Sequence, residues 1–142
     1  MDVDLLVLVG AAELSVLAAQ LVATGMTLDA TWRDWNPLLR DLQIRLRSGL
    51  VTVDVMRPRD AHDAAAVRRR RRKRIGRRYY WFVAPEDLVL QKLKVGRPRD
   101  FEDALTVWTR QGNALDRRLV RAWARRLGVS AELDYLERGL TT

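Results

Sequence analysis

The sequence contains no cysteine and only one histidine, His62, among its 142 residues. Without thiols the chain can form neither disulfides nor thiolate-bound zinc sites, and one histidine excludes a multi-histidine metal site. Any metal ion would need oxygen ligands, which favours Mg²⁺ or Mn²⁺. The sequence also lacks an apolar run of the ~20 residues that cross a bilayer, and its first residues are acidic where a secretory signal is basic. We therefore expect a soluble protein of the cytoplasm with no membrane contact.

Lysine is scarce as well, because 23 of the 26 basic residues are arginine. The formal net charge is +8, a balance that favours an anionic partner. Apolar residues make up 48% of the chain, enough to bury a core without disulfides. The length is typical of one domain, and we expect residues 1–142 to form a single one.

Apolar patterns predict a sheet in the first half of the chain. Residues 3–9 form a short apolar run that contains one charged residue, Asp4, and apolar and polar residues alternate over 42–47. A turn at Ser48-Gly49 then leads into a strand over 50–56. The other elements expected in this half are a helix with apolar residues from Leu14 to Val22 that ends near Gly25, a strand over 27–32, a helix over 60–75 ended by Gly76, and a strand over 79–83.

After residue 84 the apolar residues recur with helical spacing. Helices are predicted to begin near Pro85, Pro98, Asp116 and Ser130. We therefore predict an α/β (α+β) fold in which a mixed sheet with flanking helices occupies residues 1–84 and a helical part occupies residues 85–142.

Carboxylates occupy strand positions where a core residue is expected. Asp2 and Asp4 are two residues apart, so they share a face, and Asp54 lies in the middle of its strand. A lone buried charge there costs several kcal/mol, so a cation should compensate it. Three acids on adjacent strands could hold one or two divalent ions that bind a nucleoside triphosphate. Two simpler alternatives remain open, a solvated terminus at residues 2–4 and an ion pair between Asp54 and an arginine such as Arg45.

A second polar cluster follows within the helical part. Lys92 lies in an apolar helix, and Asp100 borders the stripe that contains Phe101 and Trp108. The two charges could pair and join their helices, and Lys92 could also bind phosphate. The two roles are compatible.

Together these features resemble the AbiEii-type nucleotidyltransferases, bacterial proteins that include many toxins of toxin–antitoxin pairs. The resemblance is carried by the Asp-x-Asp strand, the later Asp54, the Pro-Glu-Asp-Leu…Lys-Leu helix and the Arg-Pro-Arg-Asp-x-x-Asp segment. It covers most of residues 2–110 and is strongest at 84–105.

The resemblance implies a nucleotidyltransferase fold and a set of site residues. Asp2, Asp4 and Asp54 would be catalytic and would bind Mg²⁺ or Mn²⁺, with Asp54 activating the acceptor hydroxyl. Lys92 would contact the nucleotide phosphates, supported by Arg97 and Asp100. The implied partners are an NTP, an RNA acceptor such as a tRNA-like end, and a cognate antitoxin protein.

One departure from the family concerns the start of the chain. The family places a strand and a Gly-Gly or Gly-Ser turn before the Asp-x-Asp, and those backbone amides hold the triphosphate. Here only Met1 precedes Asp2. We expect a start codon further upstream. The alternative is a truncated, catalytically inactive relative that binds RNA or an antitoxin through a basic helix.

That basic helix is predicted from nine positive charges in the eleven residues 68–78. Tyr79, Tyr80 and Trp81 follow at once, as stacking groups do in RNA contacts. We predict a nucleic-acid-binding surface, with a solvated helix end as the alternative. Its residues are Arg68, Arg69, Arg70, Arg71, Arg72, Lys73 and Arg74.

Overall fold

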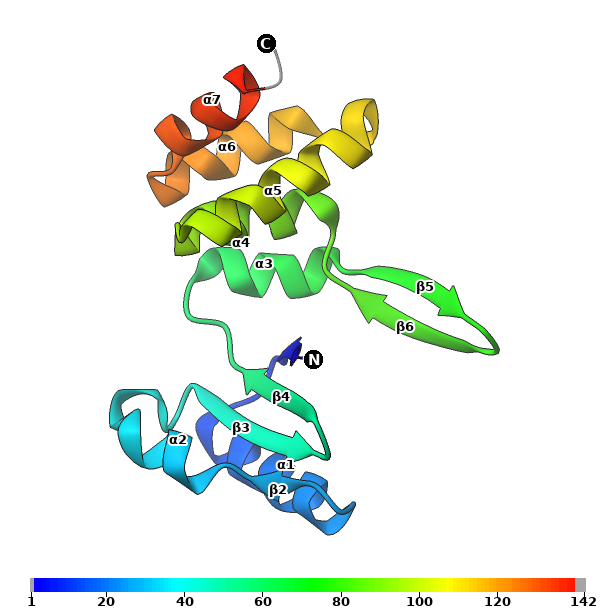
Figure 1. Cartoon of the computed structure of the whole chain (residues 1–142), viewed down its shortest axis with the longest axis vertical. Helices are drawn as coiled ribbons and strands as arrows, with labels where there is room; N and C mark the ends of the chain where they lie inside the picture. The colour runs from blue at the N-terminus through cyan, green and yellow to red at the C-terminus, as the bar shows by residue number, and fades with distance from the viewer. Residues whose placement is uncertain (1, 140–142) are drawn as a thin grey trace. The chain divides into compact units, whose positions relative to one another are not determined.

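The computed structural model describes residues 2–139, and over this range the fold is mixed α/β, with seven α-helices, a four-stranded mixed sheet and a two-stranded sheet (Figure 1). The predicted α/β class is therefore confirmed. The chain divides into two compact units, Met1–Val67 (unit 1) and Arg68–Thr142 (unit 2). This division falls earlier than the expected change at residue 84. Over residues 2–139 no helix is long and apolar enough to span a membrane.

Unit 1 contains the four-stranded sheet, in the order β1-β4-β3-β2. β1 runs parallel to β4, whereas the β4–β3 and β3–β2 pairs are antiparallel. The strands are β1 (Asp2–Leu6), β2 (Thr27–Leu28), β3 (Gln43–Ser48) and β4 (Val51–Met56). The helices are α1 (Ala11–Ala23), α2 (Ala30–Trp35), a 3-10 turn (Pro37–Leu39) and most of α3 (Ala61–Arg69).

The core of unit 1 lies between α1 and one face of this sheet (Figure 1). Leu14 from α1 packs with Leu46, Val53 and Val55 from β3 and β4, and all four side chains are buried. Because side chains alternate along a strand, the residues between these, including Arg45 and Asp54, point to the opposite face. Apolar residues therefore fix one face of the sheet against α1, and the polar residues collect on the other.

Two local predictions in unit 1 need correction. The strands around residues 42–56 form as expected, but the turn is Gly49-Leu50, one residue later than predicted, with Gly49 in the left-handed region at φ 57°. The predicted strand over 27–32 is wrong beyond Leu28, because α2 begins at Ala30. The carboxylate of Asp29 accepts a hydrogen bond from the backbone N–H of Trp32 at 2.9 Å, which caps the helix.

Unit 2 is built on the four predicted helices, which are confirmed. A buried core joins them, and Trp108 is its largest member. Gly96 and Gly128 end two of these helices in the left-handed conformation. The helices are α4 (Pro85–Val95), α5 (Pro98–Gln111), α6 (Arg117–Leu127) and α7 (Ser130–Arg138), with a 3-10 turn at Gly112–Ala114.

The predicted helix over 60–75 is wrong in its second half. Helix α3 (Ala61–Arg69) ends within the arginine run, and the chain then forms an antiparallel hairpin of β5 (Arg71–Ile75) and β6 (Arg78–Phe82). Gly76, expected to end a helix, instead occupies the hairpin turn with φ 60°. In Figure 1 the hairpin extends away from the helices of unit 2.

Candidate nucleotide site and basic hairpin

The carboxylates expected to bind a metal lie on the polar face of the sheet in unit 1. Asp4 is the register partner of Asp54 on the neighbouring parallel strand, and Asp2 is the partner of Thr52. Register partners on paired strands point to the same side, so Asp2, Asp4 and Asp54 share one face. Asp4 and Asp54 therefore lie on neighbouring strands and face the same side, which a metal site shared by three acids on adjacent strands requires.

Asp54 has an arginine partner across the hairpin. Arg45 lies directly opposite in the register, and its Nε and Nη2 donate to Oδ1 and Oδ2 of Asp54, each at 2.7 Å. The hydrogen bond to Asp54 raises the pKa of Arg45, and the charges of Asp29 and Asp2 raise it further, so the guanidinium stays charged. The cation that compensates Asp54 is therefore Arg45, which was one of the two alternatives left open by the sequence.

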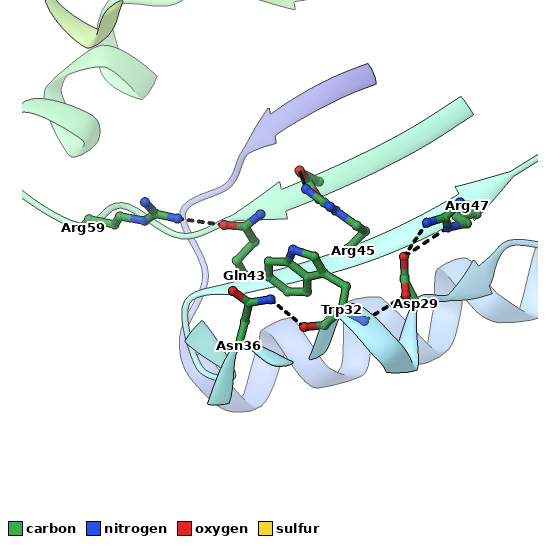
Figure 2. A network of polar contacts seen from close by, with 8 residues as sticks. Asp29, Trp32, Asn36, Gln43, Arg45, Arg47 and Arg59 are labelled. Carbon is green, nitrogen blue, oxygen red and sulfur yellow. Dashed lines mark hydrogen bonds and ion pairs between the residues drawn. The ribbon is translucent and has the colours of Figure 1, made fainter. Parts of the chain in front are cut away.

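Arg45 belongs to a polar network that joins the sheet to α2 (Figure 2). Its guanidinium lies 4.9 Å from the ring centroid of Trp32, within range of a cation–π interaction. Arg47 donates to Asp29 at 2.9 Å, and the pKa of Asp29 is lowered, first by the backbone hydrogen bond from Trp32 and then by Arg47. The network thus holds Arg45 between an aromatic ring and several carboxylates.

A groove beside Arg45 has the size of a small-molecule site. It is about 360 Å³ in volume and is lined by Trp32, Arg33, Arg40 and Arg45, together with residues of α1. The lining is mainly apolar, and the indole of Trp32 with the nearby Arg33 and Arg40 would suit a ligand that is both aromatic and anionic, as a nucleotide is. Sequence reasoning missed this groove because residues 30–32 were assigned to a strand instead of to α2.

Two of the three carboxylates are placed to bind a divalent cation, and the third is already bonded to an arginine. Asp2 and Asp4 are exposed and supply the oxygen ligands that Mg²⁺ and Mn²⁺ prefer. Asp54 differs, because both of its oxygens accept hydrogen bonds from Arg45. A cation bound to Asp54 would have to replace that guanidinium.

The other three predicted site residues come together in unit 2. Lys92 Nζ donates to Asp100 at 3.1 Å and to Asp103 at 2.8 Å, and Arg97 Nε donates to Asp100 at 2.6 Å. The hydrogen bond to Asp103, followed by that to Asp100, raises the pKa of Lys92. The pKa of Asp100 is lowered, first by Arg97 and then by Lys92. The expected pairing of Lys92 with Asp100 therefore joins α4 to α5. The six predicted residues form two groups, Asp2, Asp4 and Asp54 in unit 1 and Lys92, Arg97 and Asp100 in unit 2.

One further cluster of potential metal ligands was not anticipated. Within residues 2–139, Asp60, His62 and Asp63 form a group whose ligand atoms lie within 4.8 Å of one another. Asp60 accepts a hydrogen bond from the backbone N–H of Asp63 at 2.8 Å, and Asp63 accepts one from that of Arg59 at 2.9 Å. These are the reciprocal contacts of a helix N-terminus, so the start of α3 accounts for the placement of both acids.

The basic residues 68–74 do not form one helical surface. Arg69 Nε donates to Asp87 at 3.0 Å, and Arg71 Nη2 donates to Glu86 at 2.9 Å. Asp87 is 0% exposed and Glu86 is 2% exposed, so these two pairs anchor the base of the hairpin to the first turn of α4. The remaining basic residues of the run are exposed, namely Arg68, Arg70, Arg72, Lys73 and Arg74.

Glu86 and Asp87 are the structural residues that the sequence did not reveal. Two acids after a proline are typical of an exposed helix start, and only their burial shows that they pair with the arginines.

No protein-family model matches the chain, and no curated protein matches it.

Proposed function

We propose that this protein is a metal-dependent nucleotidyltransferase of the AbiEii type, which transfers a nucleotidyl group from an NTP to an acceptor such as an RNA end. The observation that carries the proposal is the register of Asp4 with Asp54 on neighbouring parallel strands, with Asp2 on the same face. Because NTPs and RNA are its substrates in this proposal, the protein would work in the cytoplasm. It would be one component of a toxin–antitoxin pair.

In this proposal some residues of unit 1 bind the metal ion and another accepts a proton. Asp2 and Asp4 would hold Mg²⁺ or Mn²⁺, which would supply positive charge for the triphosphate and for the pyrophosphate that leaves it. Asp54 accepts the proton of the acceptor hydroxyl once Arg45 has moved away from it. Trp32 stacks on the base in the groove, where Arg33 and Arg40 add positive charge.

Lys92 has the charge required for a phosphate contact. Its raised pKa keeps the ammonium protonated at neutral pH, and its side chain is partly exposed. Arg97 and Asp100 position it, because Asp100 accepts hydrogen bonds from both cations.

The proposal is tested by Mn²⁺ binding, measured by electron paramagnetic resonance with and without NTP. Asp4→Asn removes a ligand and should weaken Mn²⁺ binding by about tenfold or more. Arg45→Met frees the carboxylate of Asp54 and should strengthen it. Glu132→Gln, an exposed acid on α7, is the matched control and should change nothing. Equal Mn²⁺ affinities in the wild type, Asp4→Asn and Arg45→Met would refute the metal site.

A second candidate is a catalytically inactive relative that binds RNA or an antitoxin. The bidentate pair between Arg45 and Asp54 favours it, because an arginine already occupies the place of the cation. The same experiment separates the two candidates. If Arg45→Met leaves Mn²⁺ binding unchanged, Asp54 serves the sheet and the inactive candidate is preferred.

A further inference from the structure

The hairpin β5–β6 exposes an unusual set of side chains. Every residue of both strands is exposed, and Tyr79 and Trp81 are each 57% exposed. A two-stranded hairpin is marginally stable by itself, and contiguous exposed rings on such an element mark an interaction site. The other large apolar residues exposed on the two strands are Ile75, Tyr80 and Phe82.

Cations and aromatic rings alternate on both faces of this hairpin. Arg72 lies opposite Trp81 and Arg74 opposite Tyr79 on one face, and Lys73 lies opposite Tyr80 on the other. The guanidinium of Arg72 is 4.0 Å from the ring centroid of Tyr79, and that of Arg70 is 4.5 Å from the ring centroid of Trp81.

Charge and spacing together indicate the class of ligand. Residues 64–85 contain no acid, so the hairpin presents only positive charge to an anionic partner. Tyr79 and Trp81 are two residues apart on one face, about 7 Å along the strand, and each can stack on one base.

The mixing of rings and cations separates a single strand of nucleic acid from a membrane surface and from a duplex. A membrane-binding element segregates its apolar and charged residues onto opposite faces, whereas this hairpin carries both on each face. A two-stranded ribbon can enter the major groove of a duplex, but it reads base edges there with hydrogen-bonding groups. Exposed rings on both faces suit unpaired bases instead.

We propose that the β5–β6 hairpin binds single-stranded nucleic acid. Bases stack on Tyr79 and Trp81, and the phosphates contact Arg70, which directly precedes β5, and the exposed cations of the two strands and the turn. Arg69 and Arg71 take no part, because their ion pairs with Asp87 and Glu86 hold the base of the hairpin. This inference goes beyond the proposed transfer reaction, because it uses no residue of the predicted nucleotide site. The contributing cations are Arg70, Arg72, Lys73, Arg74, Arg77 and Arg78.

The test measures fluorescence anisotropy of a labelled single-stranded RNA of about ten nucleotides over a range of salt concentrations. Chelator is present and NTP is absent, so failure of the proposed nucleotidyl transfer would not affect the result. Replacing Arg72, Lys73 and Arg74 with glutamine should reduce the log–log salt slope by about 2, because each lost phosphate contact contributes about 0.7. The control replaces three exposed arginines outside the hairpin, Arg110, Arg118 and Arg125, and should keep the wild-type slope.

Stacking is tested separately with Tyr79→Ala and Trp81→Ala. Each should weaken binding about tenfold without changing the salt slope. Quenching of Trp81 fluorescence by bound RNA, absent in Trp81→Ala, would support stacking even if one variant disturbed the hairpin. Single-stranded DNA of the same sequence shows whether the 2′-hydroxyl contributes to binding. Binding of either the RNA or the DNA agrees with the proposal.

Three outcomes would overturn the proposal. The first is no binding by the wild-type chain, and the second is an equal loss of slope in the hairpin variant and the control. The third is tighter binding of a duplex than of the single strand, which would assign the hairpin to a groove.

Discussion

The two units use the same chemical pair, an arginine with a carboxylate, in different environments. In unit 1 Asp54 is on the polar face of a sheet, and its side chain remains 12% exposed beside Arg45. In unit 2 Asp87 and Glu86 are removed from water beneath Arg69 and Arg71. A partly exposed pair can exchange its cation at modest cost, whereas a buried acid depends on its arginine. The first arrangement suits a ligand site and the second suits an anchor.

The buried apolar core of unit 2 is also larger than that of unit 1. Among residues 2–139, the cluster in unit 2 contains eleven buried residues and that in unit 1 contains four. α1 covers one face of the sheet in unit 1, whereas four helices enclose the core of unit 2. We therefore expect unit 2 to be the more stable part of the chain.

The largest effect is expected from removing the central side chain of unit 2. Trp108 is buried, so Trp108→Ala should lower the free energy of unfolding by about 4 kcal/mol through lost burial and a cavity. Hydrogen exchange should show loss of protection in α4 to α6 but not in β3 and β4. Trp35→Ala, at an exposed position, is the control. Equal loss of protection in both units would show that they unfold together.

A smaller effect should separate the two kinds of ion pair. Arg69→Met leaves Asp87 buried without its guanidinium partner and should cost about 3 kcal/mol in urea unfolding. Arg45→Met leaves a partly exposed Asp54 and should cost about 1 kcal/mol. The double variant Arg69→Met with Asp87→Asn should recover part of the loss. Equal costs for the two single variants would contradict the distinction between site and anchor.

The smallest effect concerns acid stability in unit 2. The pKa of Asp100 is held below its usual 3.8 by Arg97 and Lys92, so its ion pairs stabilise the fold above the pKa of the unfolded chain, about 3.9. This stabilisation is lost as the pH falls through the lower folded pKa, because the unfolded chain binds the proton first. Asp100→Asn should therefore reduce the loss of stability between pH 5 and pH 3. Circular-dichroism melts across that range measure the stability. An unchanged dependence of stability on pH in Asp100→Asn would show that Asp100 does not contribute to acid stability.

Local periodicity is sufficient to predict the helices of unit 2. Each has an apolar stripe of helical spacing, and signals such as Pro85, Pro98 and Gly96 fix its ends. The shared face of Asp2 and Asp4 follows equally from alternation along one strand. These features depend on neighbours in the sequence, so one sequence reveals them.

The hairpin could not be predicted in this way. Arginine is a good helix former, so the run continues the helical pattern up to Gly76. Its actual conformation depends on Arg69 and Arg71 meeting acids 18 and 15 residues away. Periodicity contains no information about such pairs.

The partner of Asp54 depends on the position of a single turn. With Gly49 and Leu50 in the turn, Ser48 pairs with Val51, and Arg45 lies opposite Asp54. The predicted turn at Ser48-Gly49 would instead place Arg45 opposite Thr52, leaving the carboxylate for another cation. A shift of one residue in the turn therefore decides between an ion pair and a free metal ligand.

The charge of β5 has a consequence for how copies of this protein behave in solution. β5 and β6 form a sheet of two strands, so among residues 2–139 each has an edge without a strand neighbour. Exposed edges rich in aromatic residues are templates for aggregation. Edge-to-edge pairing would bring two arginine-rich strands to about 4.8 Å, well inside the Debye length of about 8 Å at physiological salt, where their repulsion is poorly screened. The arginines that we propose to contact nucleic acid thus also oppose the pairing of one hairpin with the next.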